Sequence, residues 1–283
     1  MIDNQQIVIK KDRKLAWLRV LVTGLLLFFA GILIMVLTGN PNLFPTVEMI
    51  GSFLVPVTFV VFLYERRHWS QLSLPTTALS FFYGGVLGVL AASLLEPIFI
   101  RQLTVFNVFV IAVIEESAKL LGVLVIARHW RHTSEMDGLI LGAAAGMGFA
   151  ALESSGYAFT AFLMSGGSLT ATVGVTLLRG VLAPVGHGVW TAILAGVLFR
   201  ESGEQHFHFN WKVLVAFLTV VLLHGLWDGI PMLITTYVST GLDVFIGQSL
   251  VAGLGLFILW WQWREARRLQ EDQHQLLGEA SAA

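Results

Sequence analysis

Apolar blocks, each close to the length of a membrane-spanning helix, recur along almost the whole chain. A bilayer hydrocarbon core of about 30 Å is crossed by roughly 20 apolar residues in helical conformation. The blocks run from Leu15 to Leu37, Val47 to Tyr64, Thr77 to Leu95, Leu103 to Ala127, Gly138 to Met164, Thr172 to Phe199, Trp211 to Tyr237 and Val244 to Trp263. Apolar and polar residues do not alternate at a period of two, which argues against a transmembrane barrel. We therefore expect an all-α fold, a polytopic transmembrane helix bundle of about eight spans.

The composition excludes several other classes of protein. Only 12% of the 283 residues are charged, about half the fraction of an ordinary soluble domain, so the chain lacks the charge to cover a globule of this size. The net charge of -1 leaves no excess of Lys and Arg for a nucleic-acid partner. With no cysteine, the chain has no disulfide, thiolate metal site or cysteine nucleophile. The partner that remains is the lipid bilayer.

The cations predict how the spans are oriented. Those near span ends are Lys10, Lys11, Arg13, Lys14, Arg19, Arg66, Arg67, Arg128, Arg131, Arg200, Lys212, Arg264, Arg267 and Arg268. An even number of spans puts all of them on one side of the membrane and leaves only Arg101 on the other, so the positive-inside rule places both termini in the cytoplasm. We expect a multi-pass protein of the cell membrane, with residues 1–283 as a single integral membrane domain and 264–283 as a cytoplasmic tail.

Ionisable side chains also fall inside the predicted spans. They are Glu115, Glu116, Lys119, Glu153, Arg179, His187, His224 and Asp228. Each costs about 2.5 to 3.5 kcal/mol at the centre of a bilayer, so together they indicate a functional site. At about 1.5 Å per residue, the two carboxylates and two histidines of four different spans reach similar depths, roughly 16 to 22 Å from the outer end of each span. By contrast, we expect Glu48, Glu96 and Asp243, which lie near span ends, to be solvated.

Local spacing adds detail to this site. Glu115 and Lys119 are four residues apart, the favourable order for an ion pair on one helix face, and His224 and Asp228 have the spacing for a carboxylate that orients a ring N–H. Pro184 predicts a kink that opens a cavity near His187. Buried structural pairing and interhelical hydrogen bonds are the alternative roles for the same residues. Separately, Gly138, Gly142 and Gly146 predict a seam for close helix packing.

Three chemistries fit such a set of residues. In hydrolysis, Glu115 or Glu116 takes the proton from a water held with Glu153, while His187 or His224 stabilises the oxyanion or protonates the leaving amine. No serine or cysteine motif supports a covalent nucleophile, so direct attack by water is preferred. In metal binding, carboxylate and imidazole from separate helices form the ligands, although His-Glu-x-x-His is missing. A proton-coupled transporter is less favoured because the chain shows no inverted repeat.

Four motifs follow one another on consecutive spans. They read Glu115-Glu116-x-x-Lys119, then Phe149-x-x-x-Glu153, then Arg179 with Pro184-x-x-His187-x-x-Trp190-Thr191, then His224-Gly225-x-x-Asp228. In this order they resemble the PrsW family of membrane-embedded proteases, within a wider group of CAAX-prenyl proteases and bacteriocin-processing or immunity proteins. The resemblance covers residues 103–230, the core that carries the motifs. Trp190 and Ser154 depart from the usual residues of the family, which bears on substrate fit more than on activity.

The resemblance implies roles for the intramembrane residues. Catalytic or metal-binding roles go to Glu115, Glu116, Glu153, His187 and His224, and supporting roles to Lys119, Arg179 and Asp228. It leaves the cofactor open: the preferred interpretation requires none, and a divalent metal such as zinc, if present, is held by Glu115, Glu153, His187 and His224. We therefore predict an endopeptidase that cleaves a membrane protein or a lipidated peptide in or near the bilayer. The alternative is a non-catalytic scaffold or immunity-type protein.

Overall fold

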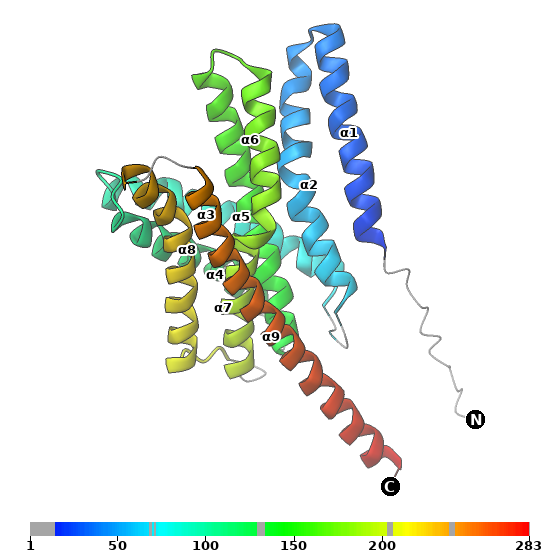
Figure 1. Ribbon diagram of the computed structural model, residues 1–283. Coiled ribbons are helices and arrows are strands. Elements are labelled where there is room, and N and C mark those ends of the chain that lie inside the picture. Colours follow the sequence, from blue (N-terminus) through cyan, green and yellow to red (C-terminus); the bar gives the residue numbers. More distant parts are fainter. Residues whose placement is uncertain are drawn as a thin grey trace, which may run out of the picture.

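The computed structural model describes residues 15–67, 70, 72–128, 134–202, 206–237 and 241–282, and every regular element in these ranges is a helix. The elements are α1 (Ala16–Thr38), η1 (Pro41–Leu43), α2 (Phe44–Glu65), α3 (Leu74–Phe99), α4 (Asn107–Ala127), α5 (Glu135–Met164), α6 (Leu169–Leu182), η2 (Ala183–Val185), α7 (His187–Glu201), α8 (Trp211–Tyr237) and α9 (Gly241–Ala282). Figure 1 shows them gathered into one bundle, with the α1–α2 and α5–α6 hairpins extending from one end. The prediction of an all-α polytopic bundle is confirmed.

Seven helical segments in the described ranges are long and apolar enough to cross a membrane. They comprise α1, α2 with η1, α3, α5, the α6–η2–α7 segment, α8 and the part of α9 from Asp243 to Gln273. The remaining predicted span is α4, which has 21 residues but carries Glu115, Glu116 and Lys119. Each of the predicted apolar blocks therefore overlaps helix, although the fourth begins at Leu103, before the start of α4 at Asn107. The protein is a multi-pass membrane protein. α9 extends the last block, because its helix continues through the predicted tail as far as Ala282.

α5 lies at the centre of the bundle, between α3 and α7. Its glycines explain how close these helices come: a Cβ at Gly138, Gly142 or Gly146 would collide with backbone carbonyl oxygens of α7. The predicted glycine seam is confirmed, and its partner is α7. On the other face, a Cβ at Gly148 would collide with the carbonyl oxygen of Phe81 in α3. Because α5 and α7 carry site residues, these contacts position the site.

The span that contains α6 and α7 is broken in the middle. α6 ends at Leu182, a short 3₁₀ segment contains Pro184, and α7 begins at His187. Proline cannot donate a backbone hydrogen bond and its ring disfavours a continuous helix, so the break occurs where the sequence predicts a kink. It places His187 at the first residue of a helix, facing the interior. Pro231 lies inside α8 without ending that helix.

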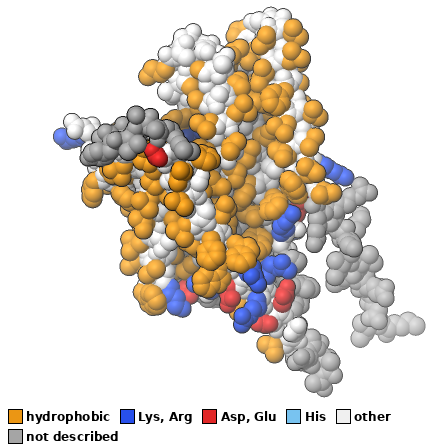
Figure 2. Space-filling view, in the orientation of Figure 1, with side chains coloured by type: hydrophobic (Ala, Val, Ile, Leu, Met, Phe, Trp, Pro, Cys, Tyr) orange, Lys and Arg blue, Asp and Glu red, His pale blue; other side chains and the backbone are white. Residues whose placement is uncertain are grey.

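The surface has the character expected for a membrane protein. In Figure 2, hydrophobic side chains cover most of the visible face, and charged side chains gather toward the end where α9 leaves the bundle. Two span-end residues differ from expectation. Glu48 is buried, and its carboxylate accepts a hydrogen bond from Ser52 Oγ at 2.7 Å, while Glu96 lines a cavity. The packing of neighbouring helices, which a span boundary does not reveal, encloses Glu48 and covers part of Glu96.

Candidate active site

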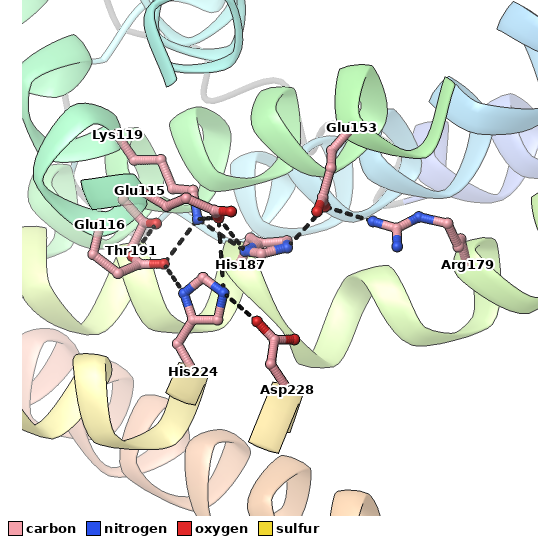
Figure 3. A network of polar contacts seen from close by, with 9 residues as sticks. All are labelled: Glu115, Glu116, Lys119, Glu153, Arg179, His187, Thr191, His224 and Asp228. Atoms are coloured by element: carbon pink, nitrogen blue, oxygen red, sulfur yellow. Dashed lines mark hydrogen bonds and ion pairs between the residues drawn. The ribbon is translucent and has the colours of Figure 1, made fainter. Parts of the chain in front are cut away.

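All eight intramembrane residues predicted from the sequence lie in one connected polar network (Figure 3). They come from five helices: α4, α5, α6, α7 and α8. In addition, Thr191 of α7 joins the network. The predicted convergence of separate spans on one site is therefore seen in the structure.

Lys119 lies at the centre of the network. Its Nζ is 3.0 Å from Glu115 Oε2, 2.8 Å from Glu116 Oε1 and 2.9 Å from His187 Nδ1. The ammonium also lies 4.0 Å from the centroid of the Phe149 ring, a cation–π contact. Lys119 is fully buried. It supplies the positive charge that two adjacent carboxylates need in a low-dielectric interior.

Glu116 is the more deeply enclosed of the two adjacent glutamates. Its Oε1 contacts Lys119 and lies 3.0 Å from His224 Nδ1, and its Oε2 accepts a hydrogen bond from Thr191 Oγ1 at 3.0 Å. Both carboxylate oxygens are thus occupied by protein donors. The geometry gives Glu116 a positioning role toward His224.

The tautomer of His187 follows from its two partners. An ammonium only donates, so Nδ1, which faces Lys119, must be an acceptor. The hydrogen is then on Nε2, which lies 3.1 Å from Glu153 Oε2 and donates to it. Glu153 is held in turn by Arg179 Nη2, while Arg179 Nε donates to Ser154 Oγ at 2.9 Å. Arg179 and Glu153 therefore fix the orientation of the His187 ring.

His224 has a carboxylate on each side of its ring. Nδ1 faces Glu116, and Nε2 lies 3.3 Å from Asp228 Oδ2 and 3.7 Å from Glu115 Oε2. The ring stacks on Trp190 with centroids 4.6 Å apart and an interplanar angle of 24°. Trp190, one of the departures from the family pattern, thus packs directly against the His224 ring of the network.

Three of these residues are arranged as a metal-binding group. Ligand atoms of Glu115, His187 and His224 all lie within 4.8 Å of one another. One carboxylate and two imidazoles suit zinc and similar divalent ions. The remaining nitrogen of each ring is backed by a carboxylate, Glu153 behind His187 and Glu116 behind His224, as metal-ligating histidines commonly are. The donor types present therefore fit a metal, which would take the place of Lys119 Nζ beside His187 Nδ1 and Glu115 Oε2. Glu153, which the sequence included among the ligands, lies behind His187 and outside this group.

The network forms part of the wall of a cavity of about 580 Å³. Glu115, Glu153, Arg179, His187 and Asp228 line it. Glu116, Lys119 and His224 are fully or almost fully buried behind them. Of the two adjacent glutamates, it is therefore Glu115 that a bound molecule meets, a distinction that adjacent positions in the sequence do not make.

Sequence reasoning gave Thr191 no role of its own. Its position four residues after His187 places both on one face of α7, directed toward α4. The sequence signal that could have identified Thr191 is this spacing: a hydroxyl residue four positions after His187, on the helix face that meets the buried Glu116. Ser154, the second departure from the family pattern, accepts the hydrogen bond from Arg179.

Comparison with known proteins agrees with this geometry. A family model described as "PrsW family intramembrane metalloprotease" matches residues 73–261. The chain belongs to the PrsW family. It is also similar to Protease PrsW of Halalkalibacterium halodurans, with 29% identity over 134 residues, which are 47% of this chain and 53% of that protein. The chain thus matches about half the length of this PrsW relative, and no solved structure matches it.

Proposed function

We propose that this chain is an intramembrane endopeptidase that hydrolyses a peptide bond by means of a water activated at Glu115. One observation carries the proposal: the Glu115 carboxylate lies at the cavity wall, with Oε2 3.9 Å from His187 Nδ1 and 3.7 Å from His224 Nε2. Membership of a family described as intramembrane metalloproteases supports the same activity. A transporter or a scaffold gives no reason for this combination of groups at a cavity.

The two adjacent glutamates have different roles. Glu115 faces the cavity and takes the proton from the attacking water, whereas Glu116 is enclosed and orients His224. His187 also lines the cavity. Its Nδ1 faces Lys119 and its Nε2–H is donated to Glu153, so it stabilises the substrate carbonyl oxygen or protonates the leaving amine through Nε2–H, when the substrate takes the place of Glu153. Glu153 and Arg179 hold its ring in position, and Asp228 does the same for His224.

A divalent metal, zinc being the ion that the donor set suits best, would be held by Glu115, His187 and His224. When bound, it supplies Lewis-acid activation of water and of the substrate carbonyl. Glu115 is then a ligand, so metal dependence decides between two roles of the same carboxylate. Without the metal, the Lys119 ammonium contacts Glu115, Glu116 and His187 and compensates the negative charge of the glutamates. With the metal bound, Lys119 would lose its contacts with Glu115 and His187 and stay paired with Glu116.

The substrate is a membrane protein or a lipidated peptide, and it reaches the site from one end of the bundle. The cavity is lined by the C-terminal part of α3, the N-terminal half of α4 and the C-terminal half of α8. These parts lie toward the end opposite Arg200, Arg264 and Lys212, which mark the cytoplasmic side under the positive-inside rule. The substrate therefore enters from the non-cytoplasmic side.

The proposed topology keeps both termini in the cytoplasm of a cell-membrane protein. Residues 1–283 form a single membrane domain, 103–230 its catalytic core and 264–283 its cytoplasmic tail. Several of the cations behind this topology, Lys10, Lys11, Arg13, Lys14 and Arg131, lie outside the described residues. The cations of α9 support it, since Arg264, Arg267 and Arg268 all lie in the C-terminal half of that helix.

The activity is tested by trapping a substrate. Glu115→Gln keeps the size of the side chain but removes the base, so membrane proteins that co-purify with this variant are candidate substrates. Reconstituted wild-type protein is expected to cleave one of them, and Glu115→Gln to reduce the rate by about 10² to 10⁴. Glu271→Gln, an exposed change on α9, is the matched control. Equal cleavage by Glu115→Gln and wild type, or stable binding without any product, would contradict the proposal, and the latter would favour a scaffold.

The metal is tested by its content as well as by activity. Protein purified without added metal should contain one divalent ion per chain by mass spectrometry if Glu115, His187 and His224 form its site. His187→Ala and His224→Ala should then each lose the ion, whereas Glu271→Gln should keep it. A fully active wild-type protein without metal would assign Glu115 as the base alone.

A further inference from the structure

Glu96 is a carboxylate in the cavity wall that the proposed mechanism does not use. It lies in the last turn of α3 and lines the cavity together with Glu115 and Asp228. Its Oε1 is buried and has no hydrogen-bond partner. Within the described residues, neither a hydrogen bond nor an ion pair reaches the Glu96 carboxylate.

The other carboxylates of the same wall all have positive or proton-donating partners. Glu115 contacts Lys119, Glu153 contacts Arg179, and Asp228 contacts His224. Arg179, the one Lys or Arg among the described residues of the wall, is thus already paired. Within the described residues, every carboxylate of the wall except Glu96 therefore has a direct partner, which leaves a local imbalance at Glu96.

The position of Glu96 in its helix adds to this imbalance. The C-terminal end of a helix carries partial negative charge, which disfavours a carboxylate. The last turn of α3 contains no basic residue. Arg101, a few residues later, is exposed, and the structure shows no ion pair between it and Glu96. The buried, unpartnered oxygen of Glu96 at this place is suited to receive a cation that comes with the ligand.

We propose that Glu96 is a specificity-determining residue that binds a cationic group of the peptide substrate. The group is a side-chain ammonium or guanidinium, or the free α-amino group of the substrate. Glu96 and Glu115 line one cavity, so the cation lies in the peptide segment close to the bond that is cleaved. This inference rests on the proposed hydrolysis for its biological meaning, but the binding of a cation at Glu96 is measurable without hydrolysis.

The experiment uses synthetic peptides that carry about 20 apolar residues to span a bilayer and a polar flank. The flank carries Lys, Gln or Glu at one position, and this position is moved along it. Each peptide is made with a free and an acetylated N-terminus, which separates a side-chain ammonium from an α-amino group. Binding is measured by photo-crosslinking to the full chain with Glu115→Gln in lipid nanodiscs, and cleavage by mass spectrometry with the wild-type chain.

A charge-assisted contact in the cavity should favour the cationic peptide over its neutral counterpart by about tenfold or more. Adding Glu96→Gln should bring this ratio close to one, and Glu96→Lys should favour the Glu peptide instead. Ser93→Ala, a neutral change about one turn away on the same wall, should keep the ratio. Thermal stability of each variant shows that its fold is retained, and the reversal by Glu96→Lys separates charge recognition from a loss of structure.

The two proposals fail in different ways. Cleavage of all peptides with no preference for a cation, or a preference that persists in Glu96→Gln, would overturn the role of Glu96 and leave the hydrolysis standing. Tighter binding of cationic peptides that depends on Glu96, with no peptide cleaved by the wild-type chain, would support the cation site and count against the hydrolysis.

Discussion

α1 and α5 are opposite extremes of the same bundle. The most apolar 18-residue stretch of α1 has a mean hydropathy of 2.9, yet only 11% of it is buried in the protein, whereas the corresponding stretch of α5 has a mean hydropathy of 1.3 and is 94% buried. Lipid tails solvate apolar side chains as well as a protein core does, so hydrophobicity does not drive a helix inward. Small residues, which allow close helix packing, and polar side chains, which bond to neighbouring helices, place a helix in the interior. In the described part of this chain, the two least apolar candidate spans, α5 and the α6–η2–α7 segment, are the most buried, and both carry residues of the site.

The largest effect on stability is expected from Lys119→Met. It leaves the buried Glu115 and Glu116 without their cation, and removing one partner of a buried charged group costs about 3 to 5 kcal/mol. Unfolding in mixed micelles should show this loss. Lys212→Met, which removes a half-exposed lysine paired with Glu201, is the control and should cost less than about 1 kcal/mol.

A double variant identifies the cause of the loss. Lys119→Met combined with Glu116→Gln removes one of the stranded charges and should recover part of the stability. If Lys119→Met were as stable as the wild type, the interior would not depend on charge compensation.

The second prediction compares the interior with the periphery by packing alone. Leu139 of α5 is fully buried and lies against Gly196 of α7. Leu139→Ala should lower the free energy of unfolding by about 2 to 3 kcal/mol, because the cavity removes close contacts that lipid does not replace. The same micelle unfolding assay measures it. A loss below about 0.5 kcal/mol would mean that α7 moves in to fill the space.

The sequence was sufficient for the fold class and for the members of the site, for one physical reason. Apolar blocks of this length are typical of helices that span a bilayer. An ionisable group inside such a block raises the free energy unless it has an opposite charge or a hydrogen-bond partner, so the few that occur are expected to lie together. The eight predicted residues do meet in the structure. The glycine seam could also be predicted from the sequence, because small residues at a spacing of four indicate a close helix contact.

Which atom faces which depends on how each helix is rotated in the bundle, and spacing within one helix does not specify that. Glu115 and Glu116 are neighbours in the chain, but one lines the cavity and the other is enclosed. Glu153 has the depth of a ligand, yet it lies behind His187. Glu96 has the sequence position of a solvated residue, and the surrounding helices enclose part of it.

A smaller effect is expected from Thr191→Val, which keeps the shape of the side chain but removes the hydroxyl that donates to Glu116. The lost hydrogen bond to a buried carboxylate should cost about 1 to 3 kcal/mol. Because Glu116 also orients His224, cleavage should fall together with stability. Thr219→Val is the matched control, since its hydroxyl is exposed and bonds only to its own helix at Val215. Equal stability and cleavage rates for the two variants would remove Thr191 from the network.

The smallest effect is expected on α1, where Leu26 is 67% exposed. At this position both a leucine and an alanine side chain contact lipid, so Leu26→Ala should change the free energy of unfolding by less than about 0.5 kcal/mol. The chemistry of the substitution is the same as in Leu139→Ala, and the two variants measured side by side in one micelle composition isolate the effect of position. Equal losses of unfolding free energy at Leu26 and Leu139 would show that apolar side chains stabilise this bundle wherever they lie. The position of α1 at the periphery would then not follow from the difference between lipid contact and protein packing.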